Sequence, residues 1–155
     1  MTTKKKELIV TSALPYANGP LHFGHLLEHI QTDLWVRAQR RLGNHCIYLC
    51  ASDAHGTPIM MKAEEENVPP EKLVDKYMKE HKKTLEAFQV SHDCYYQTHS
   101  EENKKYSELI YNAALKNGLI SKKNIKQLFD EEKKLFLADR YVQGNCPKCN
   151  APNQY

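Results

Sequence analysis

The sequence predicts an α/β fold with a parallel sheet, and three observations support this. Residues 8–10 and residues 46–51 are short apolar runs with the composition of strands buried in a sheet. Between them, apolar side chains recur at three- and four-residue spacing, as on one face of a helix. A strand, a helix and a second strand in this order form the unit in which the two strands lie parallel.

The first helix is expected to begin near His22 and to end before Gly43 and Asn44, which suit a left-handed C-terminal cap. Its predicted buried face comprises Leu26, Leu27, Ile30, Leu34, Ala38 and Leu42, with Arg37, Arg40 and Arg41 outside. The strand over residues 46–51 is continuously apolar, so we expect both of its faces to be buried.

Two further helices and a third strand are predicted after this unit. Thr57 is expected to cap a helix that has Pro58 at its first position. Residues 70–87 predict a helix whose apolar stripe comprises Leu73, Val74, Tyr77, His81, Leu85 and Phe88. We interpret His81 as a packed histidine rather than a ligand. Residues 94–98 predict a strand, and Ser100 is expected to cap a helix that ends at residues 117–118.

The pattern changes after Gly118 to short pieces typical of hairpins. Residues 127–130 and 135–137 flank a charged segment, which predicts a β-hairpin. We therefore predict two domains, residues 1–118 and residues 119–155.

Composition indicates a soluble globular protein, since 41% of the residues are hydrophobic and 26% are charged. The net charge of +3 does not by itself indicate a nucleic-acid partner, and we expect no DNA partner. No apolar run is long enough for a signal peptide or a membrane span, so we expect a cytoplasmic protein without a membrane partner. Five is an odd number of cysteines; we expect Cys46, Cys50 and Cys94 to be reduced core thiols.

The loop over residues 12–25 joins the first strand to the first helix and ends in His22-x-Gly24-His25. In a parallel sheet, ligands bind beyond the carboxyl ends of the strands, where a helix N-terminus attracts anions. His22 and His25 lie three residues apart, so both can reach one phosphate chain. Gly24 lets a flat group approach the backbone. This pattern favours a nucleotide-phosphate site over a helix start that happens to carry two histidines, or half of a metal site.

Three motifs carry a resemblance to a known family. They are Ala13-Leu-Pro-Tyr-Ala-Asn-Gly-x-x-His-x-Gly-His25, Cys50-Ala-Ser-Asp-Ala-His-Gly-Thr-Pro-Ile59 and Cys146-Pro-Lys-Cys149. In this order they resemble the class I aminoacyl-tRNA synthetases in the form of the methionyl-tRNA synthetases. The sequence departs from that pattern at Phe23, where isoleucine or leucine is most frequent, and at Ser52, where an acidic residue is common.

The resemblance implies a Rossmann-like catalytic domain, interrupted by the start of a zinc-knuckle insertion. It implies ATP-dependent activation of methionine and its transfer to tRNA(Met), with ATP, Mg²⁺ and Zn²⁺ as cofactors. His22 and His25 would be catalytic, and Cys146 and Cys149 would supply half of a zinc site. The ATP site would comprise Pro15, Tyr16, Ala17, Asn18, Gly19, His22, Gly24 and His25. The methionine site would comprise Leu14, Tyr16 and Asp53.

Alternatives remain open from the residues alone. Asp53 also suits a helix cap or a solvated loop, Leu14 suits core packing, and the two late cysteines suit free surface thiols. A different nucleotidyltransferase with the same loop and a non-catalytic RNA-binding module are the competing functions. The chain is interpreted as an amino-terminal fragment, inactive in aminoacylation by itself. Tight zinc binding would require an unidentified ligand, with His92 and His99 as candidates.

Overall fold

The computed structural model describes residues 5–132, 134–136 and 144–152. The chain forms two compact units, Met1–Tyr106 and Ser107–Tyr155, and their boundary lies inside helix α4, Glu101–Lys116. These units do not test the predicted division into two domains after Gly118, which stays a prediction.

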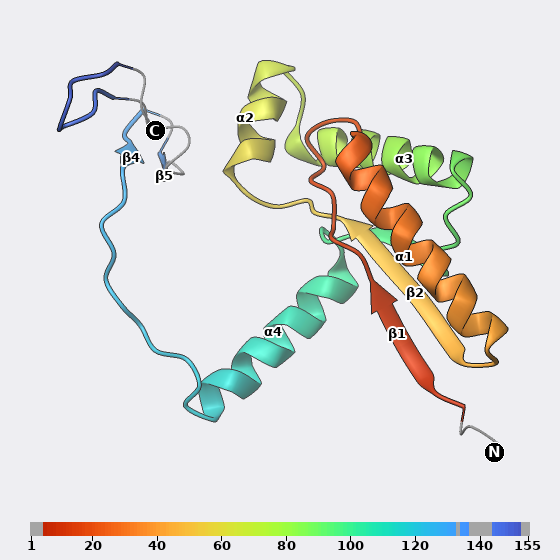
Figure 1. Cartoon of the computed structure of the whole chain (residues 1–155). Helices are drawn as coiled ribbons and strands as arrows, with labels where there is room; N and C mark the ends of the chain where they lie inside the picture. The colour runs from red at the N-terminus through yellow and green to blue at the C-terminus, as the bar shows by residue number, and fades with distance from the viewer. Residues whose placement is uncertain (1–4, 133, 137–143, 153–155) are drawn as a thin grey trace. The chain divides into compact units, whose positions relative to one another are not determined.

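The first unit contains a three-stranded parallel sheet, which confirms the predicted fold class. Its strands are β1 (Glu7–Thr11), β2 (His45–Ser52) and β3 (Cys94–Gln97), in the order β1-β2-β3. Helix α1 (Phe23–Arg41) connects β1 to β2, and helices α2 (Thr57–Glu65) and α3 (Pro70–Ala87) connect β2 to β3 (Figure 1). A parallel pair needs such a crossover because its strands start at the same edge.

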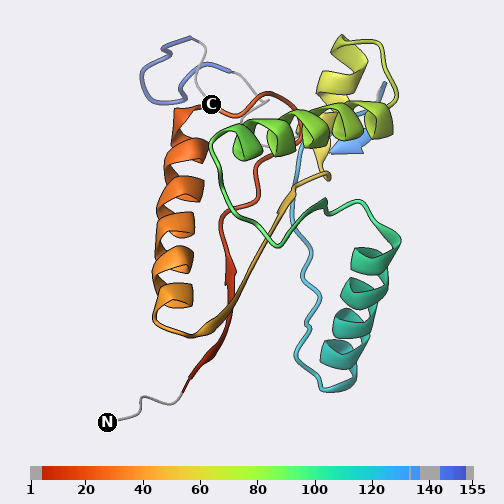
Figure 2. The ribbon, with the colours of Figure 1, turned by 90° about the vertical axis from the view of Figure 1, so that its right-hand side faces the viewer.

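The main core lies on one face of β2. Cys46, Tyr48 and Cys50 on that face pack with Leu26 and Val36 from α1 and with Leu85 from α3. Both helices thus cover the same face, and Figure 2 shows them in front of the strands. His45 and Leu49 on the opposite face are exposed, so the prediction that both faces are buried was wrong for the part of the chain described.

The buried face of α1 also differs from the prediction. It carries Leu26, His29, Asp33 and Val36, whereas Leu27, Leu34 and Leu42 are 57%, 62% and 74% exposed and Ala38 is exposed as well. Two polar side chains can be buried on this face because they have hydrogen-bond partners. His29 bonds the Ser12 hydroxyl, and Asp33 accepts a hydrogen bond from the Ser91 N–H. Apolar spacing could not reveal those partners because they lie far away in the sequence.

A second cluster joins α2, α3 and the loop before α1; its buried members are Ala17, Ala54, Ile59, Ala63, Leu73, Val74 and Tyr77. Gly56, not Thr57, is the residue before α2, so the predicted cap was wrong by one position. Gly56 has a φ of 115°, and a Cβ there would lie 2.5 Å from the Tyr16 hydroxyl. Phe88 and Cys94 are exposed, so their predicted burial was wrong.

The later elements largely follow the sequence. The Ser100 hydroxyl accepts from the Asn103 N–H at 3.2 Å and caps α4, and Gly118 adopts a φ of 70° beyond the end of that helix. Strands β4 (Phe129–Asp130) and β5 (Leu135–Phe136) form the expected hairpin in a shorter form. The expected hairpin residue Leu137 lies outside the described residues. Within those residues, no helix is both long and apolar enough to cross a membrane.

Candidate functional site

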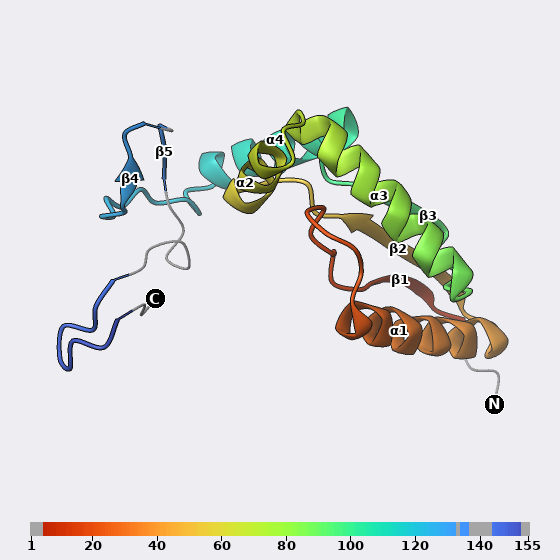
Figure 3. The ribbon, with the colours of Figure 1, turned by 90° about the horizontal axis from the view of Figure 1, so that it is seen from above.

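The loop after β1 is joined by its backbone to the end of β2. The Ala17 N–H donates to the Asp53 carbonyl at 2.8 Å, and the Asp53 N–H donates to the Pro15 carbonyl at 2.8 Å. Figure 3 shows this loop, in red to orange, reaching the tip of β2. Asp53 and the residues expected to bind nucleotide thus lie together at the carboxyl edge of the sheet, where parallel sheets bind ligands.

The two histidines of the loop form the N-terminal cap of α1. Nδ1 of His22 accepts from the Gly24 N–H at 3.1 Å, and Nδ1 of His25 accepts from the His22 N–H at 3.3 Å. The rings stack with their centroids 3.7 Å apart. Burial, then the neighbouring His22, lowers the pKa of His25. Because both Nδ1 atoms accept hydrogen bonds, each uncharged ring carries its proton on Nε2, where it can donate to an anion.

Gly24 leaves room for this arrangement. A Cβ at residue 24 would lie 3.0 Å from Cε1 and 3.1 Å from Nδ1 of His22, so any larger residue would crowd the capping ring. The glycine therefore has a packing role at the cap. Its expected role in admitting a ligand stays a prediction.

A buried hydrogen-bonded chain anchors the loop to the sheet. His81 Nε2 lies 2.7 Å from the Gly19 carbonyl, its Nδ1 lies 3.0 Å from the Ser52 hydroxyl, and Ser52 lies 2.9 Å from the Tyr95 hydroxyl. A carbonyl only accepts, so Nε2 carries the proton; burial lowers the pKa of His81, which keeps the ring uncharged. Nδ1 then accepts from Ser52, and Ser52 accepts from Tyr95.

The sequence located His81 correctly as a packed residue, since it is 1% exposed. It missed the bond to Gly19, which lies 62 residues away. A histidine on an otherwise apolar helix stripe was the only signal that could have pointed to this contact, and it does not identify the partner.

Asp53 is partly buried and holds its carboxylate beside the loop. Its Oδ1 accepts from the His55 N–H at 3.4 Å and from the Thr98 hydroxyl at 3.5 Å, both long hydrogen bonds. Among the residues that the structure describes, Asp53 has no ion-pair partner. A carboxylate with only weak partners can pair with an ammonium group.

The other predicted binding residues differ in what they can offer. Pro15 and Ala17 are buried, so their contribution is backbone, whereas Asn18 and Gly19 are partly exposed. Leu14 is 40% exposed, so it is not a core residue in this structure. Tyr16 donates its hydroxyl to the His55 carbonyl, which holds its ring beside Gly56.

A cavity of about 290 Å³ lies next to Asp53 along the chain but contains none of the predicted site residues. It is lined by Ala54, His55, Gly56, Ile59, Met60, Pro70, Glu71, Val74 and His99. The cavity therefore lies beside the loop and Asp53, not within the site they form.

The late cysteine pair lies in a turn of the second unit. The Cys146 N–H donates to the Ala151 carbonyl at 2.9 Å, and the Asn150 N–H donates to the Cys146 carbonyl at 2.8 Å. Backbone N–H groups of Cys149 and Lys148 directed at the sulfur lower the pKa of Cys146. A stabilised thiolate is what half of a zinc site requires.

No third histidine, cysteine or carboxylate joins this pair in the described part of the chain, which holds one cluster of potential metal ligands, formed by His29, Cys50 and His92. His92 therefore belongs to a different cluster, and the ring of His99 lies 5.4 Å from that of His55.

Comparison with known proteins adds a family match. A family model described as class I tRNA synthetases (M) matches residues 8–155. The Mycobacterium tuberculosis methionyl-tRNA synthetase in complex with methionyl-adenylate matches with a TM-score of 0.78 and 22% identity, over 96% of this chain and 30% of that one. The Agrobacterium radiobacter K84 agnB2 LeuRS, in a ternary complex with tRNA and LeuAMS, matches with a TM-score of 0.75 and 19% identity, over 97% of this chain and 20% of that one. The chain thus spans 30% or less of either structure, and at these identities the likeness concerns the fold.

Proposed function

Because the chain belongs to the class I tRNA synthetases, we propose that the protein that contains it activates methionine with ATP and transfers it to tRNA(Met) in the cytoplasm. The observation that carries the proposal is the backbone pairing of residues 15–17 with Asp53. It brings the loop of paired histidines and a carboxylate without a strong partner to one sheet edge. The family match argues against both alternatives, another nucleotidyltransferase and a non-catalytic RNA-binding module.

In the proposed reaction the methionine carboxylate oxygen attacks the α-phosphorus of ATP. A new oxygen–phosphorus bond forms, the bond to the β-phosphate oxygen breaks, and pyrophosphate leaves with the electron pair. The Nε2–H groups of His22 and His25 would donate to phosphate oxygens as negative charge shifts during this displacement. Mg²⁺ bound to the ATP would neutralise further phosphate charge.

The amino acid would be held by its ammonium group. We propose that Asp53 pairs with that group, since its carboxylate has only long hydrogen bonds of 3.4 and 3.5 Å to other groups. Leu14 and Tyr16 would contact the thioether, which gains from pliable aliphatic and aromatic contacts. Pairing of the ammonium group with Asp53 would orient the carboxylate of methionine toward the α-phosphate of ATP. This positioning would supply much of the rate acceleration of adenylate formation.

Methionine is the finer part of this proposal, because the two structural matches are synthetases for different amino acids with similar scores. The motifs over residues 13–25 and 50–59 and the cysteine pair resemble the methionyl-tRNA synthetases, and this resemblance favours methionine over leucine. The pair of Cys146 and Cys149 would hold zinc with two ligands from elsewhere and would stabilise the insertion.

Amino-acid-dependent exchange of radiolabelled pyrophosphate into ATP tests the proposal. We expect exchange with methionine and none above background with leucine in the enzyme that contains this chain. Exchange with leucine alone would refute the methionine assignment while keeping the family. Exchange with neither, from a folded enzyme that binds ATP, would refute the activation step.

A further inference from the structure

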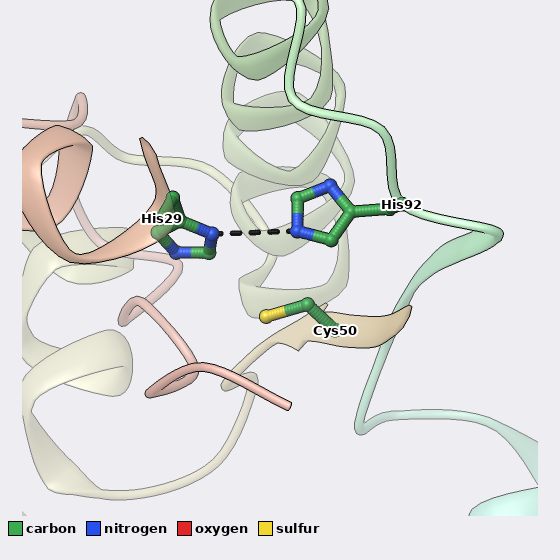
Figure 4. A group of neighbouring side chains, drawn as sticks. All are labelled: His29, Cys50 and His92. Carbon is green, nitrogen blue, oxygen red and sulfur yellow. Dashed lines mark hydrogen bonds between the residues drawn. The ribbon is translucent and has the colours of Figure 1, made fainter. Parts of the chain in front are cut away.

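A second group of side chains that could bind a metal lies in the first unit, with two of its three members buried. His29 comes from α1, Cys50 from β2 and His92 from the segment between α3 and β3. The ligand atoms of the three side chains all lie within 4.8 Å of one another. Figure 4 shows the rings of His29 and His92 directed at each other along their hydrogen bond, with the Cys50 sulfur beside them. The proposed adenylation site uses none of these residues.

The spacing of His29, His92 and the neighbouring Ser12 hydroxyl is compatible with a tetrahedral metal site. Zinc bonds of about 2.0–2.1 Å to nitrogen and about 2.3 Å to sulfur place neighbouring ligand atoms about 3.4–3.6 Å apart. His29 Nδ1 and His92 Nε2 are 3.4 Å apart. The Ser12 hydroxyl lies 3.1 Å from His29 Nδ1 and 3.6 Å from Cys50 Sγ. These separations lie within a few tenths of an ångström of the tetrahedral values, and the Cys50 sulfur lies within 4.8 Å of the ligand atoms of both histidines.

Hydrogen bonding satisfies this group only in part: His29 Nδ1 has the Ser12 hydroxyl at 3.1 Å, and the Cys50 thiol has backbone carbonyls at 3.8 Å or more. The 3.4 Å contact between the two imidazoles exceeds the usual range for a nitrogen donor. His29 is 1% exposed, yet its Nε2 atom has no hydrogen-bond partner among the described residues. An uncharged His29 with its proton on Nε2 has a lone pair on Nδ1, the atom that contacts Ser12 and His92; metal binding at Nδ1 would leave the Nε2–H as it is. Burial raises the pKa of the Cys50 thiol, so a metal would have to displace its proton in order to bind the sulfur.

We propose that His29, Cys50 and His92 bind a borderline-soft divalent cation of the Zn²⁺ type, with the Ser12 hydroxyl or a water as fourth ligand. Two imidazoles and one thiolate suit zinc and cobalt, whereas calcium and magnesium require oxygen ligands. On binding, the Cys50 S–H bond breaks, a sulfur–metal bond forms, and one proton is released to solvent.

The ion would connect three parts of the fold. Ser12 directly follows β1, so the site would tie the start of the histidine loop to α1, β2 and the segment before β3. His92 is partly exposed and lines a cavity of about 200 Å³ together with Val90 and Tyr95, so one of the three donors can be reached from solvent. The expected role is structural, and it does not depend on the proposed aminoacylation.

Cobalt is the probe, because Co²⁺ replaces zinc and absorbs visible light in tetrahedral sites, with an additional near-ultraviolet band when a thiolate binds. The protein carries Cys146→Ser and Cys149→Ser so that the late pair cannot contribute. We expect one equivalent of Co²⁺ with both spectral features, and displacement by Zn²⁺. Cys50→Ser should abolish the near-ultraviolet band, and His92→Gln should weaken binding by about a hundredfold or more, since even outer groups of metal sites cost 10–100-fold.

Cys46→Ser is the matched control, because Cys46 is a buried cysteine on the same strand but outside the cluster. It should leave both cobalt features unchanged. Where a variant fails to fold, the metal content of the Cys146→Ser/Cys149→Ser protein decides: after loading with zinc and gel filtration, it should retain one equivalent of zinc. Absence of the thiolate band, its survival in Cys50→Ser, or the absence of retained zinc would each overturn the proposal.

Discussion

Two substitutions at His81 separate the hydrogen bonds of its ring. Nε2 donates to the Gly19 carbonyl at 2.7 Å, and Nδ1 accepts from the Ser52 hydroxyl at 3.0 Å. A glutamine amide reaches about as far as Nε2 and an asparagine amide about as far as Nδ1. His81→Gln should therefore keep the bond to the histidine loop, and His81→Asn should keep the bond to the sheet.

The size of each effect follows from burial. Gly19 is partly exposed, so its freed carbonyl can bond water, and the loss should be about 0.5–1.5 kcal/mol. At about 1.4 kcal/mol per factor of ten, His81→Asn should slow adenylation about 2- to 12-fold by loosening the loop. Ser52 is 0% exposed, so His81→Gln should cost about 1 kcal/mol or more in free energy of unfolding.

Pyrophosphate exchange at saturating ATP and methionine, together with urea unfolding of both variants, measures the two effects. We expect the asparagine variant to lose rate with little change in the KM for methionine. The glutamine variant should lose stability with little change in rate. Equal losses of rate in the two variants, or rates that follow the unfolding free energy, would show that the bond to Gly19 does not position the loop.

Four further outcomes are expected. His22→Ala and His25→Ala should each slow adenylate formation about 10²–10³-fold with little change in methionine affinity, as pre-steady-state rates would show. Asp53→Asn should weaken methionine binding by about 2 kcal/mol or more at unchanged ATP affinity; equilibrium dialysis that finds equal methionine affinity would refute the pairing. Gly56→Ala should lower the unfolding free energy by about 1–3 kcal/mol in a thermal melt, since φ is 115° and Tyr16 fills the space. Burial lowers the pKa of His81 from 6.5, so as the pH falls the imidazole binds a proton in the unfolded chain before it does so in the folded chain. The contribution of the uncharged ring to the free energy of unfolding should therefore be complete above about pH 6.5 and decrease below it. Urea melts of His81→Gln should show a smaller decrease.

The sequence predicted the parts of the fold that local rules determine. Strand runs, the C-terminal cap at Gly43 and the Ser100 cap depend on near neighbours, and the structure contains all of them. The buried face of α1 could not be predicted because His29 and Asp33 are buried only through partners from distant segments. The prediction that both faces of β2 are buried was wrong for a related reason, because an apolar run does not show which of its faces the helices will cover.

The residues of the candidate site also divide into those that the sequence could locate and those that it could not. The loop, the paired histidines and Asp53 could be located because a parallel sheet brings its carboxyl ends to one edge. The bond from His81 to Gly19 and the cluster of His29, Cys50 and His92 join residues up to 63 positions apart, so no spacing rule reports them. Their roles depend on tautomers and distances, which exist only once the chain has folded.

Ser52 and Asp53 show how neighbouring residues can carry independent tasks. Successive side chains of a strand face opposite sides, and Ser52 is 0% exposed while Asp53 is partly exposed at the loop. A carboxylate at position 52 would be buried against His81 and would favour its charged form. The serine hydroxyl instead donates to an uncharged ring, and the same ring donates to Gly19. The departure from the common acidic residue therefore leaves both the loop anchor and the carboxylate of Asp53 in place.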